Sequence, residues 1–443
     1  MSNESIIEFG IYIIVGLITF LIPYFYIRRY KSKAAESAKK HDENIKTGIT
    51  EPTTLHPKID PNSCISTGAC VSACPEGEIL GIVDGHAKII SPTKCIGHGA
   101  CQVACPTDAI SLVFGTAQRG VDLPTVKETF ETNVEGIYIA GELGGMGLIR
   151  NAITQGREAV EYISKSRSSN QDCDFDLIII GAGPAGIAAG LQAKKDGLNY
   201  VIFEQENDLG GTVLSFPRQK LVMTQPMVLP LYGKFNRREI QKEELLDLWN
   251  SIAKEYELNI CTSSKVEKIS RNNSGYHVDT PKGNYKAGQV LLSIGRRGSP
   301  RKLGVKGENL SKVTYKLLEP EQYKNKHLLV VGGGDSAIEA TIALGEQAGT
   351  TVTLSYRKSS FGRIKDGNQT RLEAAVSTGW LNIIYNSTVL EISNDTVLLK
   401  CDNDENNNKI LPNDFVFIFI GGELPTTFLK NIGIEMQTKF GVA

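Results

Sequence analysis

The chain has 443 residues, with 48 basic and 49 acidic side chains and a formal net charge of −1. This length exceeds what one hydrophobic core supports and indicates about three domains. The composition is that of a globular protein, and the balanced charge gives no electrostatic basis for binding nucleic acid.

The N-terminal region contains an apolar run over Phe9–Ile27. As a helix rising about 1.5 Å per residue, this run reaches across roughly 30 Å of hydrocarbon. Arg28 and Arg29 follow the run, whereas Glu4 and Glu8 precede it. By the positive-inside rule, we expect one transmembrane helix in the inner (cytoplasmic) membrane, with the C-terminal body in the cytoplasm.

Two alternatives for the apolar run remain. A cleaved signal peptide needs basic residues before the run and a small-residue cleavage site after it, and the sequence has neither. A buried helix of a soluble protein is the other alternative, but Pro23 and the lack of a polar face fit a membrane span better. The next stretch, residues 32–54, is polar and charged, and we interpret it as a tether.

Two cysteine runs with one shared spacing follow, at residues 64–75 and 95–106. Each resembles the bacterial two-cluster ferredoxin pattern C-x₂-C-x₂-C-x₃-C-P, in which the last cysteine of each run ligates the other cluster. The second ligand position holds Thr67 in the first run and His98 in the second. The resemblance predicts one ligand set of Cys64, Cys70 and Cys105, and another of Cys95, Cys101 and Cys74 with His98.

The cluster type is left open between 4Fe-4S and 3Fe-4S. Three thiolates suffice for a three-iron cluster, and imidazole is a known substitute for thiolate on cluster iron, so His98 could complete a four-iron site. Thr67 is the poorer substitute. The alternative is a degenerate ferredoxin fold that has lost its metal or binds zinc. The other cysteines, Cys173, Cys261 and Cys401, are isolated, which indicates a reducing compartment.

A first dinucleotide unit begins with an apolar strand over residues 175–180. The turn G-x-G-x-x-G follows at Gly181, Gly183 and Gly186. In such a turn the first glycine makes the bend, the second lets a pyrophosphate approach and the third packs helix on strand. The next strand ends at Glu204, which is placed for a ribose hydroxyl.

A second dinucleotide unit follows the strand at residues 327–331. Its G-x-G-x-x-A turn consists of Gly332, Gly334 and Ala337. No acid ends the partner strand; basic residues follow it instead, at Arg357, Lys358 and Arg363. Basic side chains there accommodate a 2′-phosphate and favour NADPH over NADH. The alternative for Arg357 and Lys358 is a solvated loop.

Together the two units resemble the thioredoxin-reductase-like flavoprotein family, with FAD in the first unit and NADPH in the second. Crossover segments at residues 292–296 and 417–422, and the segment 356–363, carry the resemblance further. Thioredoxin reductase has a redox C-x-x-C in its NADPH domain, and this chain has none anywhere, which excludes disulfide reduction by that route. Dimers are usual in the resembled family.

The family's final FAD segment is displaced in this chain. The chain stops before that segment, yet residues 132–142 resemble its last strand with the flavin-contacting Gly-Asp, and residues 143–163 resemble the helix that follows. The resemblance implies a circular permutation, with Gly141 and Glu142 beside the flavin. Glu142 is longer than the family's aspartate. The alternative is an independent small unit, although one strand and one helix cannot bury a core alone.

The expected fold class is α/β, with two Rossmann-like domains for FAD and NADPH, a small α+β ferredoxin-fold module and one N-terminal transmembrane helix. In chain order the expected parts are an anchor over residues 1–30, a tether over 31–54, a ferredoxin-type domain over 55–115, the permuted FAD segment over 116–165, the first part of the FAD domain over 175–295, the NADPH domain over 296–410 and a return to the FAD domain over 411–443.

These observations predict a membrane-anchored NADPH-dependent FAD oxidoreductase that passes electrons between nicotinamide, flavin and iron–sulfur clusters, to or from an unidentified redox protein or small-molecule acceptor. Cofactors carry such chemistry, and no acid–base residue is expected to be catalytic. One alternative is a small-molecule flavin reductase with a structural ferredoxin-fold platform. Another is a non-catalytic redox sensor.

Overall fold

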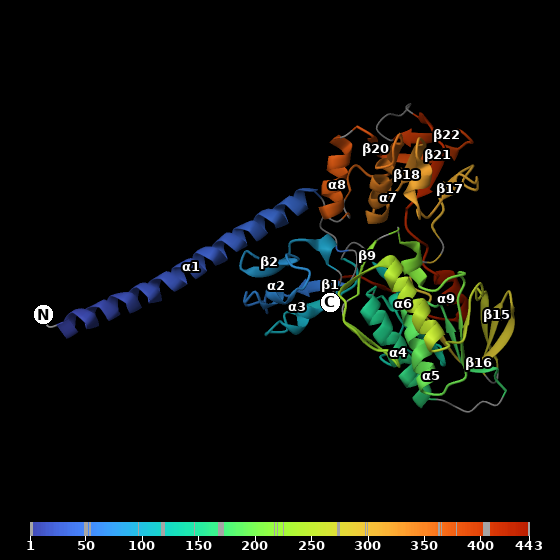
Figure 1. Cartoon of the computed structure of the whole chain (residues 1–443), viewed down its shortest axis with the longest axis horizontal. Coiled ribbons are helices and arrows are strands. Elements are labelled where there is room, and N and C mark those ends of the chain that lie inside the picture. The colour runs from blue at the N-terminus through green and yellow to red at the C-terminus, as the bar shows by residue number, and fades with distance from the viewer. Residues whose placement is uncertain are drawn as a thin grey trace. The chain divides into compact units, whose positions relative to one another are not determined.

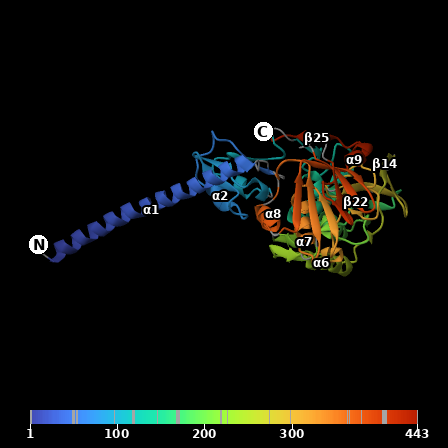
Figure 2. The same cartoon turned by 90° about the horizontal axis from the view of Figure 1, so that it is seen from above.

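The structure is a computed structural model that describes most of the chain (Figures 1 and 2). The described residues are 3–47, 52, 55–95, 97–116, 120–145, 147–166, 172–216, 218, 220–224, 226–272, 275–296, 298, 300–361, 364, 366–377, 379–401 and 408–441. The chain divides into two compact units, residues 1–113 and 114–442.

The first unit begins with one long helix, α1 (Asn3–Thr47), which contains Pro23. Its stretch Tyr12–Lys46 is long and apolar enough to cross a membrane, and none of its most apolar window is buried. Figures 1 and 2 show α1 continuing without a break to the small domain that follows it. The stretch that we interpret as a tether, residues 32–54, is thus helical as far as Thr47.

The C-terminal part of α1 docks on the next domain through polar contacts. Lys40 Nζ donates to Glu78 Oε2 over 2.7 Å, and Asn44 Nδ2 donates to the Ile90 carbonyl over 2.6 Å. A Cβ built on Gly81 would lie 2.5 Å from Ser37 Oγ, so only glycine leaves room for α1. These helix positions recur every three or four residues, which is one helical face. Because that face is polar, composition alone made it resemble a linker.

The remainder of the first unit, residues 55–113, is a small α+β domain that we name the ferredoxin module. Strands β1 and β4 pair antiparallel, and β2 and β3 form an antiparallel hairpin. Its elements are β1 (His56–Ile59), α2 (Ala69–Ala73), β2 (Leu80–Val83), β3 (His86–Ile89), the 3₁₀ turn η1 (Pro92–Lys94), α3 (Ala100–Val103) and β4 (Ile110–Val113). Both helices begin after a glycine in the left-handed region, Gly68 at φ 71° and Gly99 at φ 79°. L-residues with a Cβ rarely adopt that conformation.

The second unit contains a seven-stranded sheet that we name the FAD sheet. Its order is β13-β8-β7-β16-β15-β14, and β6 pairs with the second half of β16. The strands are β6 (Ile137–Ile139), β7 (Phe175–Ile180), β8 (Tyr200–Phe203), β13 (Ile260–Cys261), β14 (Lys268–Asn272), β15 (Gly275–Thr280) and β16 (Gly283–Leu292). The parallel strands β7 and β8 are nearly continuous apolar runs because both faces of the sheet are covered.

The helices among the described residues of this part of the unit are α4 (Ile149–Lys165), α5 (Pro184–Lys195), α6 (Lys242–Glu255) and α9 (Thr426–Ile432). Smaller elements complete it: β5 (Val121–Pro124) with β25 (Met436–Lys439), β9 (Leu221–Met223) with β12 (Glu239–Gln241), β10 (Met227–Leu229) with β11 (Gly233–Phe235), and the 3₁₀ turns η2 (Glu142–Gly144) and η3 (Gly211–Ser215). The stretch upstream of β7 thus supplies β5, β6 and α4, and β5 pairs with the last strand of the chain. The circular permutation itself stays a prediction.

A five-stranded parallel sheet, the NADPH sheet, has the order β17-β24-β18-β19-β20. Its strands are β17 (Val313–Thr314), β18 (His327–Val331), β19 (Thr351–Tyr356), β20 (Leu381–Tyr385) and β24 (Phe415–Ile418). Helices α7 (Asp335–Gly345) and α8 (Asp366–Ser377), the turn η4 (Pro320–Tyr323) and a three-stranded antiparallel sheet of β21 (Ser387–Ile392), β22 (Thr396–Cys401) and β23 (Lys409–Pro412) complete this part.

Candidate cofactor-binding sites

The turn between β7 and α5 is built so tightly that its first and third glycines have no room for a side chain. Gly181 has φ 102°, and a Cβ there would lie 2.7 Å from the Ser293 carbonyl oxygen. A Cβ on Gly186 would overlap the Gly181 carbonyl oxygen. Ser293 Oγ also donates to the carbonyls of Ile180 and Gly181, both over 2.9 Å. The protein's own backbone therefore requires glycine at these two positions.

Crowding within the protein does not explain the middle glycine of each turn. Gly183 and Gly334 are the N-cap residues of α5 and α7, with extended backbones that any residue adopts. A Cβ on Gly334 would meet nothing within 4 Å, and one on Gly183 only an atom at 3.8 Å. Since the protein leaves this space open in front of two helix N-termini, the arrangement fits a pyrophosphate lying against the backbone N–H groups.

Glu204 is buried beside the first turn, with 4% of its surface exposed. Its Oε2 accepts the Ala182 N–H over 2.6 Å, and its Oε1 accepts the Glu206 N–H over 3.0 Å. A carboxylate oxygen has two lone pairs, so each oxygen keeps one for a further donor. A ribose hydroxyl can supply that donor, whereas a phosphate cannot, and the site fits an unphosphorylated ribose.

The segment upstream of β7, which contains β6 and α4, contacts the turn between β7 and α5. Gly141 N–H donates to Gln155 Oε1 over 2.8 Å, which ties the end of β6 to α4. A Cβ on Gly156 of α4 would overlap the Ala185 carbonyl, so this glycine sets the close approach of α4 to α5. Sequence reasoning did not identify Gln155 or Gly156, although a glycine within an amphipathic helix is a signal for such an approach.

Glu142 follows Gly141 in η2 and shares its surroundings with Arg296. Burial lowers the pKa of Arg296, and the carboxylates of Glu142 and Asp122 oppose that shift. Arg296 Nη2 also donates to the Asp122 carbonyl over 3.2 Å. Arg296 ends the crossover segment that leaves the FAD sheet, so its role at this site was not apparent from sequence.

In the second turn, a Cβ on Gly332 would lie 3.0 Å from the Ala337 Cβ. Ala337 is fully buried, so α7 has room for the methyl group that α5 lacks at Gly186. Arg357 and Lys358 directly follow β19 and are exposed, so both side chains are accessible to a 2′-phosphate. Arg363 lies outside the described residues.

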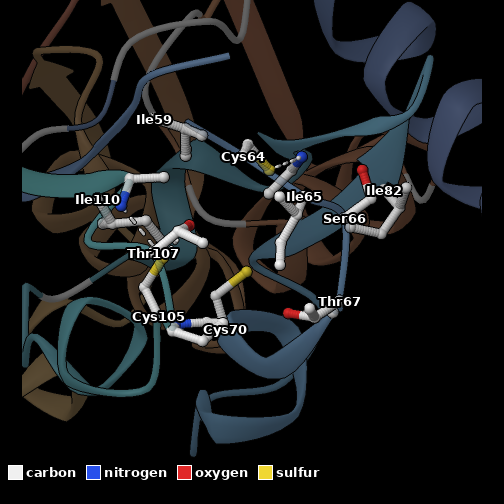
Figure 3. Close-up of a pocket in the computed structure, with 14 residues that line it drawn as sticks. Ile59, Cys64, Ile65, Ser66, Thr67, Cys70, Ile82, Cys105, Thr107 and Ile110 are labelled. Atoms are coloured by element: carbon white, nitrogen blue, oxygen red, sulfur yellow. Dashed lines mark hydrogen bonds between the residues drawn. The ribbon is translucent and has the colours of Figure 1, made fainter. Parts of the chain in front are cut away.

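The ferredoxin module has a pocket, the Thr67 pocket, that collects one of the two predicted thiol sets (Figure 3). Cys64, Cys70 and Cys105 come from three segments and face a common space, with Thr67 at its edge. Backbone donors hold two of the sulfurs: Ala87 N–H contacts Cys64 Sγ at 3.4 Å, and Ala109 N–H contacts Cys105 Sγ at 3.3 Å.

A second pocket, the His98 pocket, collects the other predicted set, Cys74, Cys95 and Cys101, together with His98. His98 Nε2 lies 3.7 Å from Cys74 Sγ, and His98 Nδ1 accepts the Ala100 N–H over 3.0 Å. Leu80 lines this pocket and Ile82 lines the Thr67 pocket, whereas Gly81 between them faces α1. Side chains of a strand alternate between its faces, so β2 separates α1 from both pockets.

Each pocket gathers three thiols around one space. Within the described part of the chain, no three His, Cys, Asp or Glu side chains gather closely enough to hold one metal ion. Three thiolates around one space fit an iron–sulfur cluster. Burial raises the pKa of the thiols of Cys70, Cys74, Cys95 and Cys101, and metal binding would displace their protons.

Comparison with protein families agrees with both parts. Residues 178–442 match the family described as pyridine nucleotide-disulphide oxidoreductase, and residues 56–106 match a 4Fe-4S dicluster domain. The first match covers more than half of the chain, so the chain belongs to the pyridine nucleotide-disulphide oxidoreductase family. It carries a two-cluster ferredoxin domain in front of the reductase.

Individual relatives cover the same reductase part. The ferredoxin–NADP reductase of Ignicoccus hospitalis is 29% identical over 269 residues, which is 60% of this chain and 83% of that protein. The bacilliredoxin reductase Bdr of Bacillus subtilis is 26% identical over 269 residues, 60% of this chain and 82% of that protein. The structure of bacillithiol disulfide reductase Bdr from Staphylococcus aureus has a TM-score of 0.52 and 25% identity, and the match covers 59% of this chain and 80% of that one.

These findings confirm the fold class and the resemblance to thioredoxin-reductase-like flavoproteins with a two-cluster ferredoxin domain. The protein is an NAD(P)H-dependent flavoprotein oxidoreductase, and its cofactors are FAD, NADPH and iron–sulfur clusters. The individual residues assigned to each cofactor stay predictions.

Proposed function

We propose that this protein is a membrane-anchored NADPH-dependent oxidoreductase in which electrons pass between NADPH, FAD and the clusters of the ferredoxin module, to or from a separate redox partner. When bound, the cofactors supply the chemistry: hydride exchange at nicotinamide and flavin, and single-electron exchange at the clusters. The residues of the chain bind and position these groups.

The observation that carries the proposal is the short covalent connection between the two halves of the electron path. The ferredoxin module ends with β4 at Val113, and the segment that joins the FAD sheet begins with β5 at Val121. So short a connection keeps the module at a high effective concentration near the flavin-binding part. The segment it enters also supplies Gly141 and Glu142, which we assign to the flavin site. Electron flow in either direction is compatible with this arrangement.

Membrane attachment rests on α1. Its apolar side chains are exposed along the predicted span, for example Tyr12 at 73%, Phe20 at 73% and Ile22 at 65%. Water would disfavour so much exposed apolar surface on one helix, whereas lipid favours it. Arg28 and Arg29 at the end of the run support a cytoplasmic location for the ferredoxin module and the reductase, by the positive-inside rule.

The anchor is tested by fractionation. The full chain is expected in the membrane fraction after an alkaline wash, and a chain that begins at residue 31 is expected in the soluble fraction with its flavin retained. If the full chain washes off the membrane, the anchor is wrong. The outcome does not affect the electron path.

The electron path is tested by the double variant Cys70→Ser and Cys101→Ser, which removes one thiolate from each pocket. NADPH should still bleach the flavin, while reduction of a one-electron acceptor that takes electrons from the clusters should fall at least tenfold. Cys401→Ser, outside the module, is the control and should behave like wild type. Full acceptor reduction by the double variant, with cluster iron lost, would instead favour a flavin reductase with a structural platform.

A further inference from the structure

The residues that replace cysteine at the second ligand positions make the same kind of bond in both halves of the ferredoxin module. Ala100 N–H donates to His98 Nδ1 over 3.0 Å, and Ala69 N–H contacts Thr67 Oγ1 at 3.4 Å. Helices α3 and α2 begin at these alanines, and their N-cap glycines have no side chain to accept a bond. Since the first N–H groups of a helix lack partners within it, His98 and Thr67 supply the missing acceptors.

In the neutral form of His98, this bond indicates which ring nitrogen carries the hydrogen. A neutral imidazole has one acceptor nitrogen and one N–H. Because Nδ1 accepts the Ala100 N–H, the hydrogen is on Nε2, and Nε2 lies 3.7 Å from Cys74 Sγ, within reach of a hydrogen bond to sulfur. Ligation of iron through Nε2 would move the hydrogen to Nδ1, where it would face the Ala100 N–H. Two donors would then oppose each other at the start of α3.

We infer that His98 is a hydrogen-bond donor to the Cys74 sulfur and not the fourth ligand of its cluster, so that both pockets bind their clusters through three thiolates. This inference rests on the proposed function, because it applies only when the two pockets bind clusters. It revises the expectation that His98 completes a four-iron site. Hydrogen bonds to a ligating sulfur tune the reduction potential, so His98 acts as a positioning and tuning residue.

The test uses the full chain in detergent, purified anaerobically through a tag without histidine, with ¹⁵N-labelled histidine. Wild-type protein should contain iron and show no strong magnetic coupling between a histidine nitrogen and a cluster. His98→Leu should keep the iron content and the cluster type, and the midpoint potential of that cluster should fall because a hydrogen bond to sulfur is lost. Thr67→Ala is the matched change in the other pocket and should also keep its cluster.

Two further variants keep the inference open to contradiction if His98→Leu fails to fold. His98→Asn retains an oxygen that can cap α3 but places no ring nitrogen near Cys74, and it should keep the cluster type. His98→Cys supplies a fourth thiolate, and it should change the spectrum of that cluster to that of a four-thiolate, four-iron site.

The contradictory result is specific. Wild-type protein could show strong magnetic coupling between a histidine nitrogen and a cluster, and both His98→Asn and His98→Leu could lose this coupling together with one iron. These results would show that His98 is a ligand. They would overturn the inference but leave the proposed electron path intact. Wild-type protein that contains no iron after anaerobic purification and reconstitution would overturn both the inference and the electron path.

Discussion

The FAD turn and the NADPH turn share one backbone plan and differ in what surrounds it. In both, the middle glycine is an N-cap with open space before it, as a pyrophosphate requires. Beside the FAD turn, the second strand is followed by the buried carboxylate of Glu204, which accepts a backbone N–H of the turn itself. Beside the NADPH turn, the strand is followed by exposed Arg357 and Lys358. We therefore expect the shared turn to bind a dinucleotide pyrophosphate, and the residues after the second strand to distinguish FAD from NADPH.

The two helices also approach their turns differently. The third turn position is Gly186 in α5, where a Cβ would overlap the Gly181 carbonyl, and Ala337 in α7, where the methyl group is packed and fully buried. The closer approach of α5 coincides with the packing of α4 against it through Gly156. The comparison leads to four predictions, which test the packing of the turns, their ligand space and their strand ends.

The largest effect is expected for the third position. Gly186→Ala should destabilise the protein by about 3 kcal/mol and abolish FAD retention, because overpacking against fixed backbone is costly. The reciprocal change, Ala337→Gly, should cost only about 1 kcal/mol through lost helix propensity. Thermal unfolding and the flavin absorbance of the purified variants measure both. Equal losses from the two changes would show that the turns do not differ in packing.

The second prediction concerns the middle glycines. Gly183→Ala and Gly334→Ala should leave the free energy of unfolding of the protein without cofactor nearly unchanged, since both backbones are extended and uncrowded. Each should weaken its own dinucleotide by about 2 kcal/mol, as a methyl group occupies pyrophosphate space. Titration of both variants with FAD and with NADPH measures these changes in affinity. A variant that loses both ligands, or neither, contradicts the assignment.

The third prediction concerns the buried acid. Glu204→Gln should weaken FAD binding and lower stability by about 2 kcal/mol, because a hydrogen bond to a charged acceptor is lost and an amide donor can face the Ala182 N–H. FAD titration and denaturant unfolding measure the change. The matched control is Glu206→Gln, which changes the same functional group two residues along the chain. NADPH binding should be unaffected in both variants.

The smallest effect is expected for Arg357 and Lys358, which follow β19 beside the NADPH turn. Arg357→Ala and Lys358→Ala should each raise the KM for NADPH about tenfold, which corresponds to a loss of about 1.4 kcal/mol of binding free energy. The KM for NADH should stay unchanged, because only NADPH carries the 2′-phosphate. Lys430→Ala, an exposed lysine of α9, is the control. If the KM values for both cofactors stay unchanged, the two residues belong to a solvated loop, as the alternative interpretation holds.

Sequence patterns were sufficient wherever a chemical requirement falls on neighbouring residues. Each dinucleotide turn is defined by glycines a few positions apart, and each cysteine run by a repeated spacing. The apolar run of α1 is likewise local, because length and composition alone make it a candidate membrane span. The resemblance to two-cluster ferredoxins implied the two crossed cysteine sets, and the structure brings each of these sets together in one pocket.

Tertiary structure decided what depends on residues distant in the chain. Gln155, Gly156 and Ser293 support the FAD turn from other elements, and nothing in their own sequence surroundings marks them for that contact. The polar face of α1 looked like a linker until Gly81 and Glu78 were placed against it. The bond from the Ala100 N–H to His98 Nδ1, on which our inference about His98 rests, likewise became visible only in the fold. A sequence states which groups a residue carries, but only the fold determines which of their donors and acceptors are already used.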